Sequence, residues 1–203
     1  MKYFINLFII VILLNSCGKD NKTGNETIDF NNFYQIKTIK QKIGTIDGVA
    51  CKDKNELEIQ YYEPLKGKKI ANQYKFYKNN KIDSLKSYFY DLKFKKVASD
   101  SYSGDIELMY HKEKILEIEF KAITSWSNKT NTLAFKSNNS NKIHFDFTNT
   151  NYEFPIKGIL CVKIEADTII KGKKIEGYSN RFMLVDNNVM TDNLYIKKYK
   201  RYF

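Results

Sequence analysis

The feature that most constrains the fold of this chain is the alternation of apolar and polar residues in short segments after about residue 45. In the segment 142–147, Ile143, Phe145 and Phe147 alternate with polar residues. A period of two places successive side chains on opposite faces of a β-strand. The same period groups three further sets on single faces: Leu57, Ile59 and Tyr61; Ile106, Leu108 and Tyr110; Leu116, Ile118 and Phe120.

Turn residues separate these runs and predict the fold class. Asn79-Asn80, Ser103-Gly104 and Asn138-Asn139-Ser140 are examples of such turn signals. Further strands are expected at 73–78, 86–95, 131–136, 158–165, 174–185 and 193–199. Short strands without intervening helices favour an all-β fold, an antiparallel sandwich or barrel-like domain of about ten strands. The chain has 203 residues, which is long enough for one domain with a hydrophobic core, so we expect one domain.

The segment before the first clear strand is open to two interpretations. Its apolar residues recur at three- and four-residue steps, between Asp29 and Gly44 as possible helix ends. They are Phe33, Ile36, Ile39 and Ile43. This spacing predicts a short amphipathic helix, whereas an extended strand that uses Tyr34, Ile36 and Thr38 explains the same region.

Residues 1–16 have the composition of a targeting peptide. Lys2 supplies the charge, and an apolar run from Phe4 to Leu14 is interrupted only by Asn6. This run covers eleven positions, whereas a helix that spans a bilayer needs about 20 apolar residues. The run therefore fits the core of a signal peptide and not a permanent membrane anchor.

The sequence Leu14-Asn15-Ser16-Cys17 resembles the lipobox of bacterial lipoproteins, although Asn15 is less usual at its position. The resemblance implies cleavage after Ser16, diacylglycerol on the Cys17 sulfur and acylation of the new amine. Gly18 follows the cysteine where inner-membrane lipoproteins often carry Asp, which implies the outer membrane, facing the periplasm or the cell surface. The alternative is an ordinary signal peptide with a chance cysteine. We expect a lipidated flexible tether at 17–28, since 18–27 are polar, and one β-rich domain at 29–203.

The other two cysteines are candidates for a disulfide. Cys51 and Cys161 would lie in a compartment where disulfides persist. A bridge between them would close a loop of roughly 110 residues and stabilise the fold by about 4 to 5 kcal/mol. Two free, buried cysteines are the alternative. A catalytic thiol is not expected, because neither His111 nor His144 lies in a recognisable cysteine-protease context.

The net charge of +11 favours anionic partners by electrostatic steering. However, only Arg181 and Arg201 are arginines, and bidentate recognition of phosphate and bases normally relies on Arg. This scarcity argues against a dedicated nucleic-acid binder.

Few residues have a pattern that indicates chemistry. His144 and Asp146 share the polar face of one strand, but a metal site needs three or four converging ligands and the chain has no HxxH, HExxH or CxxC motif. We therefore expect no metal and no cofactor. Glu107, Glu117 and Glu119, together with Asp146, suggest paired carboxylates for glycan hydrolysis. The alternative is that these carboxylates simply occupy the solvent-exposed faces of amphipathic strands and have no catalytic function.

Two aromatic segments are candidate partner contacts. Trp126 lies in a polar, loop-like setting, where an aromatic side chain suits a sugar or a protein, and the alternative is that it closes one end of the core. The C-terminal segment interleaves basic and aromatic residues, of which we take Tyr195, Lys197, Lys198 and Tyr199 as candidate contacts. Lysines also protect an edge strand from pairing, which is the alternative explanation of this segment.

The leading hypothesis is a lipid-anchored envelope protein that acts as a non-enzymatic binding or interaction module. Its partner would be an envelope protein or a glycan, and one specific version is an immunity-type lipoprotein that blocks a toxin. The chain lacks GxSxG, P-loop and dinucleotide-binding motifs, which favours binding over catalysis. The alternative hypothesis is a small envelope hydrolase or glycan-processing enzyme that uses the carboxylates.

Overall fold

A computed structural model describes residues 33–43, 45–46, 49–50, 55–64, 67–110, 113–126, 129–150, 155–170 and 173–199. Residues Asn31–Phe203 form one compact unit. Its described part is built almost entirely from antiparallel strands, which confirms the predicted all-β fold. The signal peptide, Cys17 and the tether lie outside the described residues. No helix in the described ranges has the length and apolar composition needed to span a membrane.

The strands outnumber the about ten expected, because several short ones show no alternation in the sequence. In chain order the elements are β1 (Tyr34–Lys42), β2 (Thr45–Ile46), β3 (Val49–Ala50), β4 (Asn55–Pro64), β5 (Ile70–Lys78), β6 (Lys81–Ile82), β7 (Phe89–Lys96), β8 (Ser101–Met109), β9 (Ile115–Trp126), β10 (Lys129–Asn138), β11 (Lys142–Thr148), β12 (Lys157–Glu165), β13 (Thr168–Ile170), β14 (Lys173–Ile175), β15 (Tyr178–Asp186), β16 (Met190–Thr191) and the helix α2 (Leu194–Tyr199).

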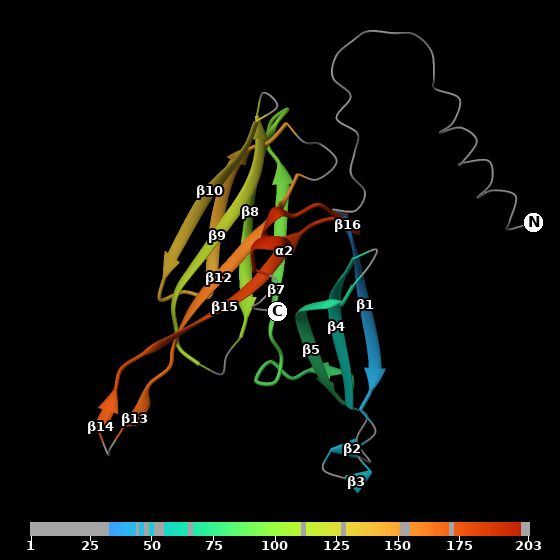
Figure 1. Ribbon diagram of the computed structural model, residues 1–203, viewed down its shortest axis with the longest axis vertical. Helices are drawn as coiled ribbons and strands as arrows, with labels where there is room; N and C mark the ends of the chain where they lie inside the picture. Colours follow the sequence, from blue (N-terminus) through green and yellow to red (C-terminus); the bar gives the residue numbers. More distant parts are fainter. Residues whose placement is uncertain are drawn as a thin grey trace, which may run out of the picture. The chain divides into compact units, whose positions relative to one another are not determined.

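The described strands form three larger sheets and two short two-stranded ones, β2-β3 and β13-β14. The first has the order β16-β1-β4-β5-β6, the second β10-β9-β12-β15 and the third β11-β8-β7. Figure 1 shows the four strands of the second sheet running side by side. A single antiparallel bridge between Tyr74 and Tyr88 joins the first sheet to the segment before β7. β15 is an edge strand of the second sheet, and it contacts β5 of the first sheet.

The first core lies between the second and third sheets, as in a β-sandwich. On β11 buried and exposed residues alternate strictly, with Ile143, Phe145 and Phe147 inside, as the sequence predicts. Phe145 packs against Phe120 of β9, with 5.3 Å between the ring centroids. Full burial of each such side chain contributes about 1.5 to 3 kcal/mol.

Gly104 lies in the middle of β8 and not in the turn that the sequence suggested. A Cβ atom at this position would approach the carbonyl oxygen of Lys93 to 2.4 Å and the Phe145 ring to 2.7 Å. The glycine therefore allows the neighbouring backbone and an aromatic ring to approach β8 closely, as glycine often does inside a strand.

The second core covers the other face of the second sheet. Ile123, Ile159 and Leu184 of that sheet pack with Tyr62 of β4 and Ile196 of α2. Because both faces of β12 are covered, buried residues are nearly continuous along its first half. A strand buried on both faces loses the simple alternation of an amphipathic strand.

The helix expected near residues 33–43 is wrong, and the strand alternative is confirmed. β1 pairs with β4 over nine residues, from Tyr34 opposite Pro64 to Lys42 opposite Glu56. This pairing satisfies the backbone hydrogen-bonding groups of β1. The three- and four-residue spacing of the apolar residues gave no indication of this long-range pairing. Cross-strand ion pairs such as Lys40 with Glu56, at 2.7 Å, support the register.

The strand expected at 193–199 is also wrong, because this segment forms α2. The Asn193 side chain accepts a hydrogen bond from the Tyr195 amide at 3.1 Å, which is the usual arrangement of a helix N-cap. Lys197 and Lys198 lie in the last turn, where positive charge is favourable. The long strand expected at 174–185 is divided into β14 and β15.

Two expected turns are confirmed. Asn79 and Asn80 connect β5 to β6 with positive φ angles of 51° and 63°, as a two-residue hairpin turn of type I′ requires. Asn139, with a φ of 51°, lies between β10 and β11. Asparagine tolerates this left-handed conformation better than most residues.

Candidate functional site

A pocket of about 330 Å³ opens between β5 and the edge of β15. β5 contributes residues 71–74, β15 contributes residues 180–182, and Tyr88 completes the lining. The lining combines two tyrosines, one arginine, one phenylalanine and three side-chain amides. A concave site with apolar walls and a few polar groups is typical of a ligand pocket.

Amide side chains hold the two sides of this pocket together. The Asn72 side chain accepts the Leu184 N–H at 2.6 Å and donates to the Leu184 carbonyl at 2.9 Å. Gln60 Oε1 accepts hydrogen bonds from Asn72 and from Gln73, each at 3.0 Å. Since β15 is the last strand of its sheet, the Asn72 amide takes the place of a further strand at this point.

Tyr88 lines the pocket and carries a buried hydroxyl. Its backbone exchanges two hydrogen bonds of 2.9 Å with Tyr74, and its ring packs edge-on against Tyr110 at 5.2 Å between centroids. Tyr88 is only 6% exposed, yet its hydroxyl has no hydrogen-bond partner among the described residues. Burial raises the pKa of Tyr88 far above its usual value, so the hydroxyl keeps its proton and remains a donor.

Arg181 is the cation of the pocket. Its guanidinium lies over the rings of Tyr88 and Tyr110, with 5.7 Å and 5.3 Å to the ring centroids, in cation–π contacts. Its Nη2 donates to the two carboxylate oxygens of Glu113 at 3.5 Å and 3.4 Å. Its Nε is buried and has no hydrogen-bond partner in the described part of the chain. A buried donor that is left unpaired costs about 1 to 3 kcal/mol.

Glu113 connects Arg181 to Tyr110. Its carboxylate accepts a hydrogen bond from the Tyr110 hydroxyl as well as those from Arg181. Burial, followed by this hydrogen bond, raises the pKa of Tyr110 to about 12. The Tyr110 hydroxyl therefore stays protonated and donates to Glu113 at neutral pH.

Sequence reasoning did not select this site. Its contacts join residues far apart in the chain, such as Arg181 with Glu113 and Asn72 with Leu184. One signal was available, because Arg181 is one of only two arginines in a chain rich in lysine.

Cys161 lies on β12 and carries a free thiol, half-buried against the second core. Burial raises the pKa of Cys161 to about 11, so the thiolate that nucleophilic catalysis needs is scarce at neutral pH. Cys51, the other half of the predicted disulfide, lies outside the described residues.

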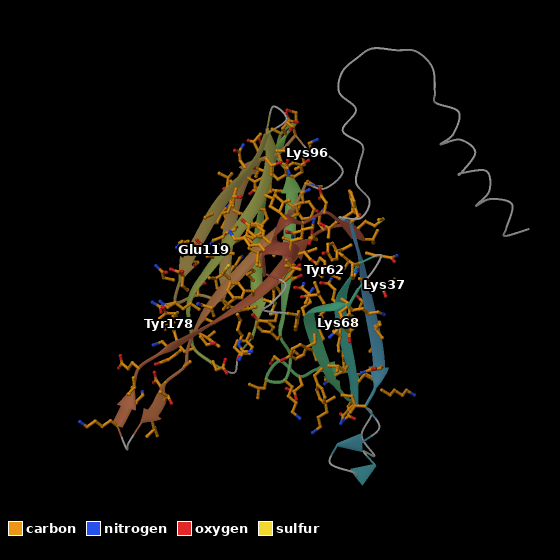
Figure 2. The ribbon with its side chains drawn as sticks, in the orientation of Figure 1. Lys37, Tyr62, Lys68, Lys96, Glu119 and Tyr178 are labelled. Carbon is orange, nitrogen blue, oxygen red and sulfur yellow. The ribbon has the colours of Figure 1, made fainter. Side chains whose placement is uncertain are left out.

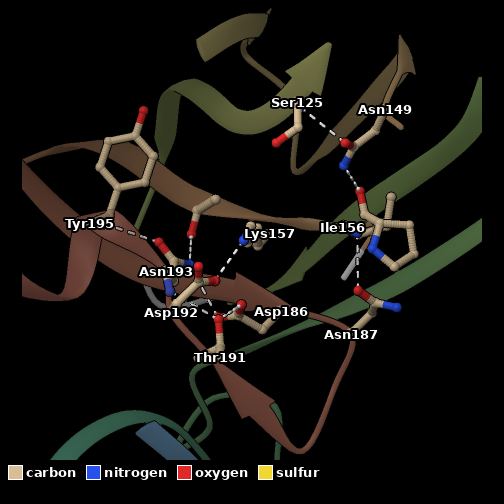
Figure 3. Close-up of polar contacts among 12 residues, drawn as sticks. Ser125, Asn149, Ile156, Lys157, Asp186, Asn187, Thr191, Asp192, Asn193 and Tyr195 are labelled. Atoms are coloured by element: carbon tan, nitrogen blue, oxygen red, sulfur yellow. Dashed lines mark hydrogen bonds and ion pairs between the residues drawn. The ribbon is translucent and has the colours of Figure 1, made fainter. Parts of the chain in front are cut away.

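A second polar cluster surrounds Asp186 at the end of β15 (Figure 3). Its carboxylate accepts hydrogen bonds from Thr191 at 2.5 Å, Tyr62 at 2.7 Å and Asn193 at 3.1 Å. Burial raises the pKa of Asp186 to about 6, against the opposing effect of these hydrogen bonds. The partners come from β4, β16 and the cap of α2, so the cluster ties the C-terminal segment to the second sheet.

Lys157 and Asp192 form an ion pair beside this cluster, with 2.6 Å between Nζ and Oδ1 (Figure 3). The Lys157 side chain is only 7% exposed. Lys157 is not among the residues that line the pocket between β5 and β15.

The expected proximity of His144 and Asp146 is present, with 3.0 Å between Nε2 and Oδ2. Asp105 on β8 approaches the other ring nitrogen, also at 3.0 Å. It was missed because the cross-strand register is not visible in the sequence. His144 is exposed, and the described residues contain no group of three or more His, Cys, Asp or Glu side chains arranged to hold a metal.

The four carboxylates of the hydrolase alternative do not gather at one place. Glu119 lies on β9 (Figure 2). It forms ion pairs with Lys121 at 2.9 Å and Lys136 at 3.3 Å. Glu117 contacts Lys136 as well. Glu107 and Asp146 lie in the third sheet, on β8 and β11. The lysines lower the pKa of Glu119 despite its burial, which does not suit a general acid.

The predicted partner contacts have different positions. Tyr195 is 7% exposed and packs in the second core, so it does not form the exposed contact that the sequence predicted. Lys197 and Lys198 are exposed on α2, and the edge-strand interpretation fails because the segment is helical. The side chains of Trp126 and Tyr199 lie outside the described residues.

The chain matches no family model, no curated protein and no solved structure.

Proposed function

We propose that this chain is a lipid-anchored envelope protein that acts as a non-enzymatic binding module, with the pocket between β5 and β15 as its ligand site. One observation carries the proposal: the hydroxyl of Tyr88 and the Nε of Arg181 belong to residues of the same pocket, and both are buried without a hydrogen-bond partner among the described residues. Native proteins satisfy almost all buried polar groups, so two unsatisfied donors at one pocket indicate a missing acceptor.

The residue types of the pocket support binding more than catalysis. Tyr and Arg are the residues that dominate binding energy at recognition sites. Asn72 and Gln73 are fixed by hydrogen bonds, which reduces the entropy that a ligand must remove. The nearby thiol of Cys161 is half-buried and held protonated, so it does not supply a nucleophile. The scattered carboxylates give the hydrolase alternative no support.

The anchor follows from the resemblance of Leu14-Asn15-Ser16-Cys17 to a lipobox. Lipid chains on Cys17 would attach the domain to the membrane, because each buried methylene contributes about 0.8 kcal/mol. Gly18 favours the outer membrane, with the domain in the periplasm or at the surface. The polar residues 18–27 would give the pocket reach to a ligand or partner of the envelope.

Photocrosslinking in intact envelopes tests this function. A photoreactive amino acid replaces Asn180 at the pocket, and a matched variant carries it at Leu133, which is exposed on β10. We expect one discrete adduct, of reproducible mass, only from the Asn180 position. This adduct should disappear in a double variant that also carries Arg181→Gln. Equal adducts from both positions, or an adduct that survives Arg181→Gln, would remove the pocket from the proposal.

A further inference from the structure

We infer that the pocket binds the carboxylate of a singly charged ligand, and that this carboxylate competes with Glu113 for Arg181. The inference rests on the proposed function, since it names the ligand chemistry of the same site. It is argued from the geometry of the guanidinium, the position of Glu113 and the charges of the pocket.

The guanidinium offers a planar set of donors that matches a carboxylate. Arg presents its N–H groups in a rigid fork that fits two carboxylate oxygens, whereas Lys offers a point charge. In Arg181 the Nη2 faces Glu113, while Nε is buried and has no partner among the described residues. Tyr88 lines the same pocket, and its buried hydroxyl is a second donor without a partner in that part of the chain. One carboxylate has two oxygens, which is enough to accept from both.

Glu113 is a carboxylate of the chain itself that already contacts this guanidinium. Its oxygens lie 3.4 Å and 3.5 Å from Nη2, at the long end for a hydrogen bond between charged groups. The side chains of Glu113 and Arg181 are 29% and 41% exposed, so solvent screens their attraction. A weak internal ion pair of this kind can be replaced by a ligand carboxylate that also reaches the unpaired Nε.

The charges of the pocket select for a single negative charge. Arg181 is the one cation among the lining residues that the structure describes, and Glu113 already balances part of its charge. Glu113 would repel a doubly charged anion such as sulfate about twice as strongly as a monocarboxylate at the same distance, because the repulsion scales with the charge of the ligand. The rings of Tyr74 and Tyr88, together with Ala71, offer apolar surface to the rest of such a ligand.

Calorimetric titration of the full chain in detergent, against a protein-free detergent blank, tests the inference with benzoate and benzamide. These two probes have the same shape and differ in charge. We expect benzoate to bind at least about tenfold more tightly than benzamide, because hydrogen bonds to a charged acceptor are roughly twice as strong. Sulfate should bind more weakly than benzoate.

Three variants locate the effect. Arg181→Lys keeps the charge and loses the fork, so benzoate affinity should fall about tenfold or more. Glu113→Gln removes the competing carboxylate while retaining the shape, so benzoate should bind about threefold to tenfold more tightly and benzamide with little change. Lys136→Gln, a change at a surface cation paired with Glu119 on β9, should leave both affinities unchanged.

The outcomes separate the inference from the proposed function. Equal affinity for benzoate and benzamide, lost together in Arg181→Lys, would overturn the carboxylate inference and leave the pocket as a binding site. Weaker benzoate binding by Glu113→Gln would overturn the competition. Binding of neither probe to the parent chain or to Glu113→Gln would contradict both the inference and the proposed pocket.

Discussion

The side-chain amide of Asn72 forms two hydrogen bonds with the main chain of Leu184, one in each direction, at 2.6 Å and 2.9 Å. It thereby completes the edge of β15 with a side chain from β5, across 112 positions of sequence. This contact fixes the spacing between the two strands at one end of the pocket.

Replacing Asn72 with alanine should therefore reduce the free energy of unfolding by about 1 to 3 kcal/mol, because the Leu184 amide loses its acceptor, while the Leu184 carbonyl keeps the Tyr90 hydroxyl as a donor at 3.1 Å. Urea unfolding measures the change. Asn131→Ala, at an exposed position of β10, is the control and should change stability by less than about 0.5 kcal/mol. A loss for Asn72→Ala no larger than the control would mean that this amide does not hold the strands together.

Asp186 gives the fold a pH dependence with a defined sign. Its pKa is raised from 3.8 in the unfolded reference to about 6 in the folded chain, mainly by burial. Between these values the folded state holds more protons, so the free energy of unfolding should fall as pH rises from 4 to 6. The expected fall is about 2 to 3 kcal/mol.

The measurement is a series of urea unfolding curves from pH 4 to 7, for the parent chain and for Asp186→Asn. The variant cannot titrate at this position, so its stability should show a flatter pH profile over this range, even if it is less stable throughout. The two profiles running parallel would show that Asp186 titrates alike in the folded and unfolded states.

His144 should titrate above its usual pKa of 6.5, because Asp105 and Asp146 each accept a hydrogen bond from the charged ring. The folded state is therefore favoured at low pH, and this contribution is lost as pH rises through the raised pKa. NMR titration of the imidazole should give a pKa that returns toward 6.5 in Asp105→Asn, and less so in Asp146→Asn. A ring that titrates identically in all three proteins would contradict the assigned contacts.

The sequence predicts the fold class well where one face of a strand is buried. The alternation on β11 survives intact because one of its faces meets the core and the other meets water. β12 is covered on both faces, so its pattern predicts a strand but not which sheets it joins. β1 and α2 were wrongly or ambiguously assigned for a common reason, since long-range packing overrides short-range spacing. The N-cap at Asn193 was a signal that the sequence did contain.

The candidate site was beyond sequence reasoning because it depends on register and sheet order. Arg181 on β15 and Glu113, just before β9, meet only because β12 lies between β9 and β15 in the sheet. The unpaired state of the Tyr88 hydroxyl is a property of its surroundings, and no residue type encodes it. Likewise, His144 and Asp146 could be paired from their spacing on one strand, whereas Asp105 required the register of β11 with β8.

Gly104 should tolerate no side chain. A Cβ atom there would come within 2.4 Å of the Lys93 carbonyl, which is backbone and cannot rotate away. Gly104→Ala should reduce the free energy of unfolding by about 1 to 3 kcal/mol or more, as overpacking does. Ser103→Ala on the same strand is the matched control in urea unfolding; it removes only the hydrogen bond to Asp146 at the surface and should cost less than Gly104→Ala. Equal stability of Gly104→Ala and the parent chain would contradict the close packing of β7, β8 and β11 at this point.

The central claim is that the pocket keeps unpaired donors for a ligand, and a pair of tyrosine variants tests it in one measurement. The Tyr62 hydroxyl donates to Asp186, whereas the Tyr88 hydroxyl donates to no described residue. In urea unfolding without ligand, Tyr62→Phe should reduce the free energy of unfolding by about 1.5 to 3 kcal/mol, because the hydrogen bond to Asp186 is lost. Tyr88→Phe should instead increase the free energy of unfolding by about 1 kcal/mol, because a buried hydroxyl without a described partner is removed. A loss of stability in Tyr88→Phe comparable to that in Tyr62→Phe would show that this hydroxyl is already satisfied within the folded chain, and would contradict the account.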